Sequence, residues 1–152
     1  MTTIRPFSIY DIFKFNNVNL DILTETYHTD FYGKYMAKWG EYCVLAENSV
    51  GMIEAYILGK VEGDINNDTK KNWHGHVTAV TVSPYFRKQG LARALMNILE
   101  DVSDRIHKAY YVDLYVRSSN AVAIGMYKKM GYDVYQTVDR YKDLYYLQVL
   151  LF

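Results

Sequence analysis

The sequence predicts an α/β protein, with a mixed sheet and helices on both of its sides. Strand-like runs rich in β-branched residues alternate with amphipathic helix-like runs, and a basic turn with a glycine joins one such strand to the next helix. The chain has 152 residues, half of them hydrophobic. That length suits one domain with a substantial core, so we expect a single domain over residues 1–152.

The expected elements follow the order β-α-α-β-β-β-α-β-α-β-β. The first helix opens with a capping box, Ser8-x-x-Asp11, and Asp30 is placed to cap the second. Hairpin chemistry at 48–51 separates two strands. Strands are expected at 2–7, 41–47, 52–62, 77–82, 110–116 and 132–141, helices at 8–17, 30–39, 90–105 and 120–130, and loops at 18–29 and 63–72.

Composition argues against several classes of protein. The net charge is zero and the pI is near 6.9, so charge alone gives no reason to expect a nucleic acid or an anionic membrane as partner. No apolar run approaches the roughly 18 residues of a membrane span, and Met1 to Arg5 does not open a signal peptide. A single cysteine, Cys43, suits a reducing compartment, so we expect a cytoplasmic protein. Within its apolar strand Cys43 is predicted to be buried rather than nucleophilic.

A basic turn is the strongest functional signal. It runs Arg87-Lys88-Gln89-Gly90 and lies between a strand and a helix. Gly90 lets the backbone approach a ligand, and the free N–H groups and dipole of the helix N-terminus favour an anion. The alternative is an ordinary solvated turn. The turn matches neither the P-loop nor the dinucleotide pattern.

A second motif lies further along the chain. Asn120 is placed to cap a helix, Ala123 and Tyr127 fall on the helix face below it, and Gly131 is placed to end the helix before Tyr132. Together, Arg87-x-x-Gly-x-Ala and Asn120-x-x-Ala-x-x-x-Tyr…Gly-Tyr resemble the coenzyme-binding motifs of the GNAT acetyltransferases.

The resemblance extends to one group within that superfamily. Segments 19–27, 73–79 and 112–117 are similar to the catalytic subunits of NatB N-terminal acetyltransferases, and the likeness runs from residue 1 to about Tyr141. The apolar stretch 142–152 is shorter than the corresponding end of that family and departs from it.

The resemblance implies a GNAT fold and acetyl-CoA as co-substrate, without a metal. It implies transfer of the acetyl group to the α-amine of nascent chains that begin Met-Asp, Met-Glu, Met-Asn or Met-Gln. It also implies a large helical-repeat auxiliary subunit that docks the enzyme at the ribosome. Two alternatives stay open: a GNAT enzyme for another amine (a NatA-like peptide, a lysine or a polyamine), and an acyl-CoA-binding subunit without turnover.

The same resemblance implies roles for individual residues. Those expected to bind acetyl-CoA are Val80, Val82, Arg87, Lys88, Gln89, Gly90, Leu91, Ala92, Asn120, Ala123 and Tyr127. Those expected to contact the peptide are Glu25, Tyr27, His74, Gly75, His76, Thr78, Ala79 and Tyr141. For catalysis we expect Tyr127 to protonate the leaving thiolate, and water relayed by His74, Glu25 or Tyr141 to take the proton of the amine.

Each of these roles has a structural alternative. Tyr127 could simply pack on the sheet, and the pair Glu25 and Tyr27 could be an exposed loop without function. His74 and His76 lie two apart on an extended segment and so share a face, but no third metal ligand is in view. Gly75 between them is expected to mark a bulge or a close approach of backbone.

The two early helices carry more aromatic residues than a small helix pair needs for packing. This excess predicts that part of their surface is an interface with a large subunit. The alternative is that the sheet covers all of it. The residues concerned are Ile12, Phe13, Phe15, Phe31, Tyr35 and Trp39.

Overall fold

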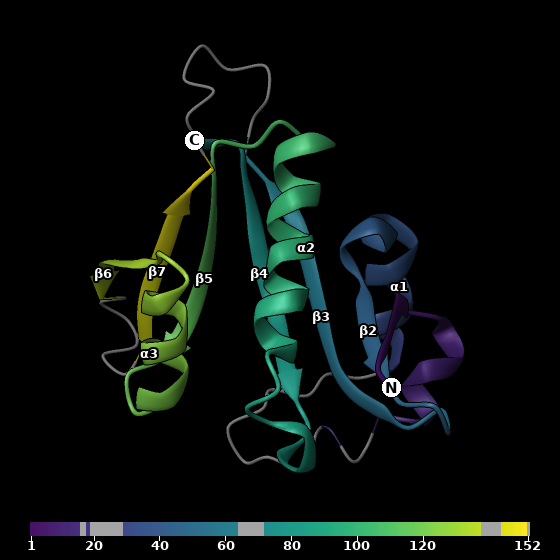
Figure 1. Cartoon of the computed structure of the whole chain (residues 1–152). Coiled ribbons are helices and arrows are strands. Elements are labelled where there is room, and N and C mark those ends of the chain that lie inside the picture. The colour runs from purple at the N-terminus through teal and green to yellow at the C-terminus, as the bar shows by residue number, and fades with distance from the viewer. Residues whose placement is uncertain (16–17, 19–28, 64–71, 138–143, 152) are drawn as a thin grey trace. The chain divides into compact units, whose positions relative to one another are not determined.

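The computed structural model describes residues 1–15, 18, 29–63, 72–137 and 144–151. Within these residues, seven strands form a mixed sheet with the hydrogen-bonded order β1-β2-β3-β4-β5-β7-β6 (Figure 1). The elements are β1 (Thr3–Pro6), η1 (Ile9–Phe13), α1 (Thr29–Trp39), η2 (Gly40–Tyr42), β2 (Val44–Glu47), β3 (Ile53–Glu62), β4 (His74–Val82), η4 (Pro84–Phe86), α2 (Leu91–Arg105), β5 (Tyr111–Arg117), α3 (Ala121–Lys129), β6 (Asp133–Thr137) and β7 (Leu144–Leu150).

The pairing of the strands explains why the sheet is mixed. β4 pairs with β5 in parallel, whereas β1 with β2, β2 with β3, β5 with β7 and β6 with β7 are antiparallel. The chain divides into two compact units. The first comprises residues 1–60 and 78–99, and the second comprises 61–77 and 100–152. The parallel and antiparallel strand pairs confirm the predicted α/β class with a mixed sheet.

The first unit has an aromatic core. The ring of Phe15 lies edge-on to those of Tyr32 and Tyr56, at centroid distances of 5.1 and 5.3 Å. Most of the aromatic residues of η1, α1 and the residues beside them pack into this core. Phe15 and Tyr35 are buried in this core, while Ile12, Phe31 and Trp39 pack against it. Of the predicted interface set only Phe13 is well exposed, at 75 %.

The beginning of the first unit follows its predicted capping box but not its predicted length. Ser8 Oγ accepts from the N–H of Tyr10, and the N–H of Ser8 donates to Asp11 Oδ2 at 2.6 Å. The helix expected to reach residue 17 is wrong, because η1 is a 3₁₀ turn that ends at Phe13. The N–H of Lys14 bonds to the carbonyl of Asp11, three residues back, and this keeps the tighter geometry.

Two other boundaries differ from prediction. The strand expected from residue 41 begins only at Val44, because the 3₁₀ turn η2 precedes it and the N–H of Cys43 bonds to the carbonyl of Gly40. The helix expected to start after a cap at Asp30 begins at Thr29, so Asp30 lies inside its first turn. The predicted hairpin is confirmed, with Gly51 at φ +83° and Asn48 Oδ1 accepting from two backbone N–H groups.

In the second unit Gly75 permits a close approach between β4 and α2. A Cβ atom built on Gly75 would lie 2.1 Å from Ser103 Oγ, so no larger residue fits without a shift. The parallel ladder to β5 passes through the Gly75–Val112 pair in regular register. Of the two expectations for this glycine, close approach is confirmed and a bulge is not.

Candidate active site

The basic turn, Arg87–Gly90, leads from the end of β4 into α2 within the first unit. Lys88 and Gly90 both have left-handed backbone, with φ values of 63° and 77°. No atom lies within 4 Å of a Cβ built on Gly90, so open space faces the backbone here. Arg87 Nε donates to the carbonyl of Val82 at 3.3 Å, which ties the turn to the strand. All four residues of the turn are exposed.

The first turn of α2 supplies backbone donors next to this space. The N–H of Ala94 bonds to the carbonyl of Gly90, and the N–H groups before it precede the first intrahelical bond. Leu91 is buried and anchors the helix start. With the helix dipole and the charges of Arg87 and Lys88, this arrangement fits a phosphate or pyrophosphate group. Val80, Val82 and Ala92 are half-buried along the same segment.

Tyr127 lies in α3 of the second unit. Its side chain is 6 % exposed, and its ring lies edge-on to that of Tyr132 at 5.8 Å. Burial raises the pKa of Tyr127 well above its usual value, so the phenol keeps its proton near neutral pH. Among the described residues none hydrogen-bonds to its hydroxyl, whereas the hydroxyl of Tyr132 donates to Glu100 at 2.8 Å. Tyr127 therefore offers an uncommitted O–H group.

Asn120 has the predicted structural role. Its side-chain oxygen accepts from the N–H of Ala123 at 3.2 Å, and α3 begins at the next residue, Ala121. Gly131 follows the helix with φ +97°, as a glycine after a helix end commonly does. Ala123 is half-buried one turn into the helix.

A histidine–aspartate cluster (His74, His76, Asp113 and Tyr146) lies in the second unit, on one face of β4, β5 and β7. His76 Nδ1 lies 2.6 Å from Asp113 Oδ1, and His74 Nε2 lies 3.1 Å from Asp113 Oδ2. Tyr146 donates its hydroxyl to Asp113 Oδ2, and Gln148 Nε2 donates to that hydroxyl at 3.1 Å. Asp113 itself is 3 % exposed.

These contacts set the charge of the cluster. Burial alone would raise the pKa of Asp113, but hydrogen bonds from His74, His76 and Tyr146 outweigh it and hold that pKa far below its usual value. Burial alone would lower the pKa of His74, yet its hydrogen bonds to Asp113 and to the Asn72 carbonyl raise it. The ring of His74 also stacks on Tyr111, with centroids 4.7 Å apart. The cluster therefore favours a buried carboxylate at Asp113 and the protonated form of His74.

Cys43 is no candidate nucleophile. It is fully buried in the first unit, with Sγ 3.4 Å from the carbonyl oxygen of Trp39. Burial, together with the charge of Glu41, raises the pKa of its thiol to about 12. The thiolate is therefore almost absent near neutral pH.

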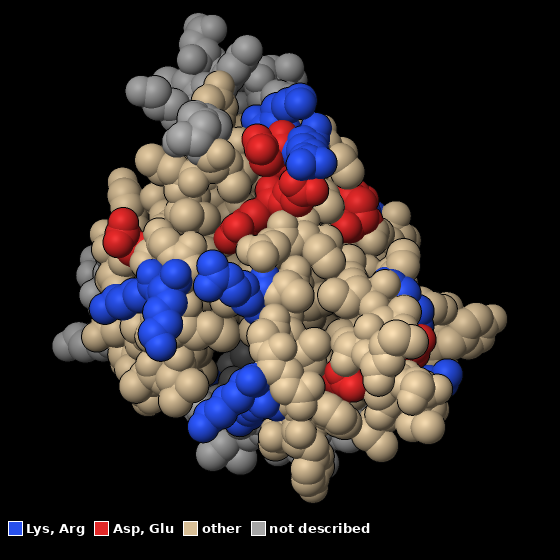
Figure 2. Space-filling model, viewed as in Figure 1, with Lys and Arg blue, Asp and Glu red and all other residues tan. Residues whose placement is uncertain are grey.

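No metal centre and no membrane span emerge from the part of the chain that the structure describes. Within it, no three His, Cys, Asp or Glu side chains are placed to hold a metal ion, and no helix is long and apolar enough to cross a bilayer. Acidic and basic side chains gather together over the C-terminal half of α2, where Asp101 pairs with Arg105 (Figure 2). In this part of the view neither sign of charge dominates.

Comparison with known proteins identifies the family. The model of the acetyltransferase (GNAT) family matches residues 8–132 of the chain, which include the basic turn, both histidines and α3. The chain belongs to the acetyltransferase (GNAT) family. The matched residues include both motifs that resemble this family in the sequence, the basic turn and the helix that follows Asn120.

Relatives within the acetyltransferase family narrow the assignment. The N-terminal acetyltransferase B complex catalytic subunit NAA20 of Arabidopsis thaliana is 55 % identical over 141 residues, which are 93 % of this chain and 78 % of that protein. Chaetomium thermophilum Naa20 in complex with a bisubstrate analogue matches with a TM-score of 0.89 and 39 % identity, over 97 % of this chain and 86 % of that one. A NatB acetyltransferase complex bound to CoA and MES gives a TM-score of 0.83 and 34 % identity, over 97 % and 98 %. The predicted resemblance to NatB catalytic subunits is thus confirmed.

The structure places the predicted site residues of this acetyltransferase in separate settings. The predicted coenzyme-binding residues from Val80 to Ala92 lie in one continuous segment of the first unit. Thr78 belongs to the same segment, and its hydroxyl shares a hydrogen bond with the hydroxyl of Tyr35. Ala79 packs against the aromatic core. His74, Gly75 and His76 belong to the second unit. Glu25, Tyr27 and Tyr141 lie outside the described residues.

Sequence reasoning missed Asp113 and Tyr146. A signal for Asp113 exists, because a carboxylate within the apolar run Tyr111–Val116 must find partners if the run is a buried strand. The identity of those partners depends on strand register. Asp113 faces His76 across the parallel ladder and Gln148 across the antiparallel one. Neither register can be read from local sequence.

Proposed function

We propose that this chain is the catalytic subunit of a NatB-type N-terminal acetyltransferase. It transfers the acetyl group of acetyl-CoA to the α-amine of nascent chains that begin Met-Asp, Met-Glu, Met-Asn or Met-Gln. The observation that carries the proposal is the 55 % identity to a NatB catalytic subunit along nearly the whole chain. Work in the cytoplasm at the ribosome, through an auxiliary subunit, belongs to the same proposal.

The basic turn is proposed to hold the pyrophosphate of acetyl-CoA. Gly90 leaves open space in front of backbone donors, and Arg87 and Lys88 supply exposed positive charge. Charge-assisted hydrogen bonds to phosphate oxygens are among the strong ones, and the helix N-terminus adds favourable dipole energy. Val80, Val82, Gln89, Leu91 and Ala92 flank the turn, and we assign them to the same ligand together with Asn120, Ala123 and Tyr127 of the second unit.

Peptide binding is assigned to Glu25, Tyr27, His74, Gly75, His76, Thr78, Ala79 and Tyr141. The positive charge of His74 supports this assignment, because it favours an acidic side chain at the second position of the peptide. A substrate carboxylate would compete with the Asn72 carbonyl for the N–H at Nδ1. Asp, Glu, Asn and Gln side chains share an acceptor oxygen for such a donor.

Tyr127 is assigned as the proton donor to the leaving coenzyme A thiolate. Its burial keeps the phenol protonated, and its hydroxyl has no other partner among the described residues. A thiolate that leaves inside a pocket shielded from water is stabilised by such a proton.

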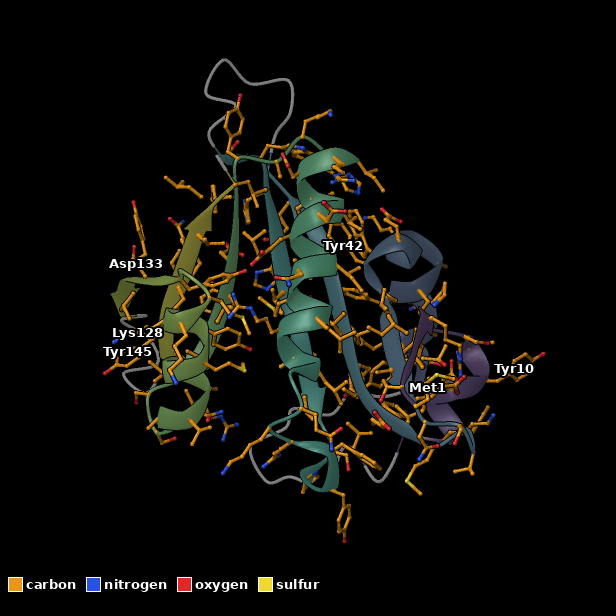
Figure 3. All side chains as sticks on the ribbon, in the orientation of Figure 1. Met1, Tyr10, Tyr42, Lys128, Asp133 and Tyr145 are labelled. Atoms are coloured by element: carbon orange, nitrogen blue, oxygen red, sulfur yellow. The ribbon has the colours of Figure 1, made fainter. Side chains whose placement is uncertain are left out.

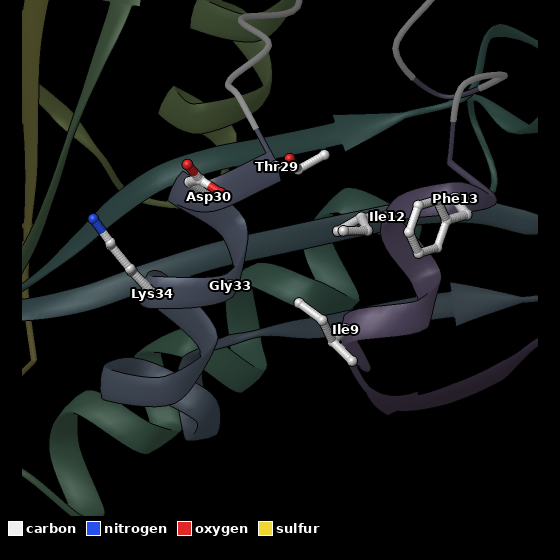
Figure 4. Close-up of a pocket in the computed structure, with 7 residues that line it drawn as sticks. All are labelled: Ile9, Ile12, Phe13, Thr29, Asp30, Gly33 and Lys34. Carbon is white, nitrogen blue, oxygen red and sulfur yellow. The ribbon is translucent and has the colours of Figure 1, made fainter.

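The auxiliary subunit is proposed to dock beside η1. A hollow of about 450 Å³ opens between η1 and α1 (Figure 4), with Ile9, Ile12, Phe13, Thr29, Asp30, Gly33 and Lys34 around it. Tyr10 projects from η1 away from the ribbon (Figure 3) and is 72 % exposed. Exposed aromatic residues on η1, next to a hollow that is apolar on its η1 side and polar on its α1 side, suit a large protein partner.

This docking site has a direct test. Phe13→Ser should reduce co-purification with the auxiliary subunit at least about fivefold, since exposed aromatic anchors dominate interface energies. Val122→Ser on α3 is the matched control, because Val122 is also well exposed, at 87 % against 75 % for Phe13, and lies outside the hollow. Equal recovery of partner with both variants would remove the hollow from the interface.

A peptide panel tests the function. The full chain, with and without a co-purified auxiliary subunit, is incubated with acetyl-CoA and a Met-Asp, a Ser-Glu or an internal-lysine peptide, and mass spectrometry locates the added acetyl group. We expect the α-amine of the Met-Asp peptide to be modified fastest. Preference for Ser-Glu or lysine would point to another GNAT activity. Binding of acetyl-CoA in calorimetry without turnover of any peptide would point to a non-catalytic subunit.

A further inference from the structure

The two histidines of β4 differ in what their ring nitrogens face. His74 Nδ1 lies 2.6 Å from the carbonyl oxygen of Asn72, and its Nε2 lies 3.1 Å from Asp113 Oδ2 and 3.4 Å from Glu62 Oε2. A carbonyl oxygen and ionised carboxylates only accept hydrogen bonds. Both nitrogens of His74 must therefore carry protons, so the ring is an imidazolium with both N–H groups engaged.

His76 has the opposite arrangement. Its Nδ1 lies 2.6 Å from Asp113 Oδ1, so this nitrogen is the donor. Its Nε2 has no hydrogen-bond partner among the described residues. The ring of Tyr115 lies edge-on to it, with centroids 5.7 Å apart. In the neutral ring the proton stays on Nδ1, and the lone pair of Nε2 is available to accept a proton.

Asp113 is held so that it can direct both rings. Tyr146 donates to its Oδ2, and Gln148 donates to Tyr146, so the carboxylate is fixed from β7 as well as from β4. Three other groups face members of the cluster: Glu62 from β3, and Tyr111 and Tyr115 from β5. A base whose far nitrogen is oriented by a buried carboxylate is a recurrent catalytic arrangement.

We infer that His76 is the general base for the substrate α-amine and that Asp113 is the positioning residue that fixes its tautomer. This rests on the proposed function and assigns a role within it. It places proton acceptance at His76 rather than at His74, whose nitrogens have no free lone pair. His74 contributes fixed positive charge instead.

The protons of the reaction balance. His76 Nε2 takes one proton from the α-ammonium group, directly or through one water, and the amine then attacks the carbonyl carbon of the thioester. A C–N bond forms and the C–S bond breaks. Tyr127 gives its proton to the thiolate and recovers one, through solvent, from the nitrogen that has become an amide. His76 returns its proton to solvent.

Two substitutions separate the base from its support. His76→Asn keeps a donor near the Nδ1 position but removes Nε2, so we expect kcat to fall about 10²-fold or more, in line with general base catalysis. Asp113→Asn replaces the acceptor at His76 with an amide that can donate, which favours the wrong tautomer, so kcat should fall by at least about tenfold. Affinity for acetyl-CoA, measured by calorimetry, should change less than about twofold in both, because the basic turn is untouched.

Matched controls come from the same unit. Asp133→Asn makes the same chemical change on the exposed strand β6, and His107→Asn does so for a histidine outside the cluster. Both should keep wild-type kcat. The pH profile of kcat/KM is the second readout: its rising limb should change in His76→Asn and keep its wild-type form in both controls.

Nitrogen NMR of the histidine rings in the full chain tests the inference without turnover. We expect His74 to show two protonated nitrogens at a pH above about 6.5, the ordinary pKa of a histidine, and neutral His76 to carry its proton on Nδ1. Asp113→Asn should move that proton to Nε2. A wild-type His76 protonated on Nε2 would overturn the inference, and so would His76→Asn with wild-type kcat while chemistry limits the rate. If the wild type acetylates no peptide, the proposed function fails instead, and the NMR result still stands or falls on its own.

Discussion

The basic turn of the first unit and the histidine–aspartate cluster of the second unit present polar groups in opposite ways. The turn offers exposed backbone and the exposed side chains of Arg87 and Lys88 around Gly90, with open space in front. The cluster offers half-buried side chains that are already paired through one 3 %-exposed carboxylate, Asp113. The cluster is arranged by contacts within the protein, whereas the turn leaves its backbone donors open to a ligand.

This difference separates the residues that set affinity for acetyl-CoA from those that set the rate of acetyl transfer. A loose, charged cradle tolerates many anions and depends on ionic strength. A buried, fully paired carboxylate fixes proton positions and cannot lose a partner cheaply, because the remaining charge stays uncompensated. We therefore expect substitutions in the turn to change binding of acetyl-CoA, and substitutions in the cluster to change turnover and pH dependence.

Gly90→Asp should give the largest effect. It fills the open space in front of the backbone donors with a negative charge, so we expect affinity for acetyl-CoA to fall at least about 100-fold, as desolvation and repulsion act together. Gly51→Asp is the matched control, because Gly51 also has positive φ and no atom within 4 Å of its Cβ position. Calorimetry on both separates ligand repulsion from backbone strain. Equal affinities in the two variants would show that the turn holds no anion.

Tyr127→Phe should lower kcat next most strongly. We expect a loss of about 10²-fold with unchanged affinity for acetyl-CoA, if the phenol supplies the proton of the leaving thiolate. Tyr132→Phe is the control, since it removes the hydroxyl of the neighbouring ring, which donates to Glu100. That variant should lose stability rather than kcat. Steady-state and single-turnover kinetics decide, and a Tyr127→Phe enzyme within twofold of wild type when chemistry limits the rate would leave Tyr127 as a packing residue.

Lys88→Glu should have a smaller, salt-dependent effect. Lys88 is exposed, so its reversal should weaken acetyl-CoA binding roughly tenfold at low ionic strength and less at 0.5 M salt. Lys108→Glu is an unusually close control, because Lys108 is also exposed and also left-handed, with φ 55° against 63°. Titrations at two salt concentrations distinguish them. A loss that does not shrink with salt would speak against an electrostatic role.

The pH dependence of stability should be the smallest effect and should belong to the cluster. The raised pKa of His74 means that the folded state holds a proton that the unfolded chain releases above a pH of about 6.5. The free energy of unfolding should therefore fall as pH rises from that point through the raised pKa, by at most about 1.4 kcal/mol per pH unit. The lowered pKa of Asp113 adds stability that is constant here and is lost only in acid.

Urea unfolding between pH 6 and 9 measures this slope. His74→Gln should flatten it, and His107→Gln should leave it unchanged. A wild-type slope of zero over this range would mean that folding does not change the proton binding of His74, which contradicts its raised pKa.

Sequence predicted the turn better than the cluster for a physical reason. The turn is contiguous, and its glycine, its basic residues and the helix after it are local signals. The same holds for the Asn120 cap and the hairpin at 48–51. The cluster joins residues 74, 76, 113 and 146 through two strand registers, and register depends on the packing of the whole sheet. The helix predicted to residue 17 failed because a capping box indicates only where a helical turn begins, and the turn here keeps 3₁₀ hydrogen bonding and ends at Phe13.

Cys43 gives the chain an internal reporter. It is the single thiol, fully buried in the first unit, with a pKa near 12. An alkylating reagent can modify it only in molecules whose first unit has transiently opened, so the labelling rate counts such openings and ignores those confined to the second unit. A ligand held at the basic turn lies in the same unit and should slow labelling in proportion to its occupancy. Acetyl-CoA binding could thus be followed by mass spectrometry without an added probe, and without any turnover.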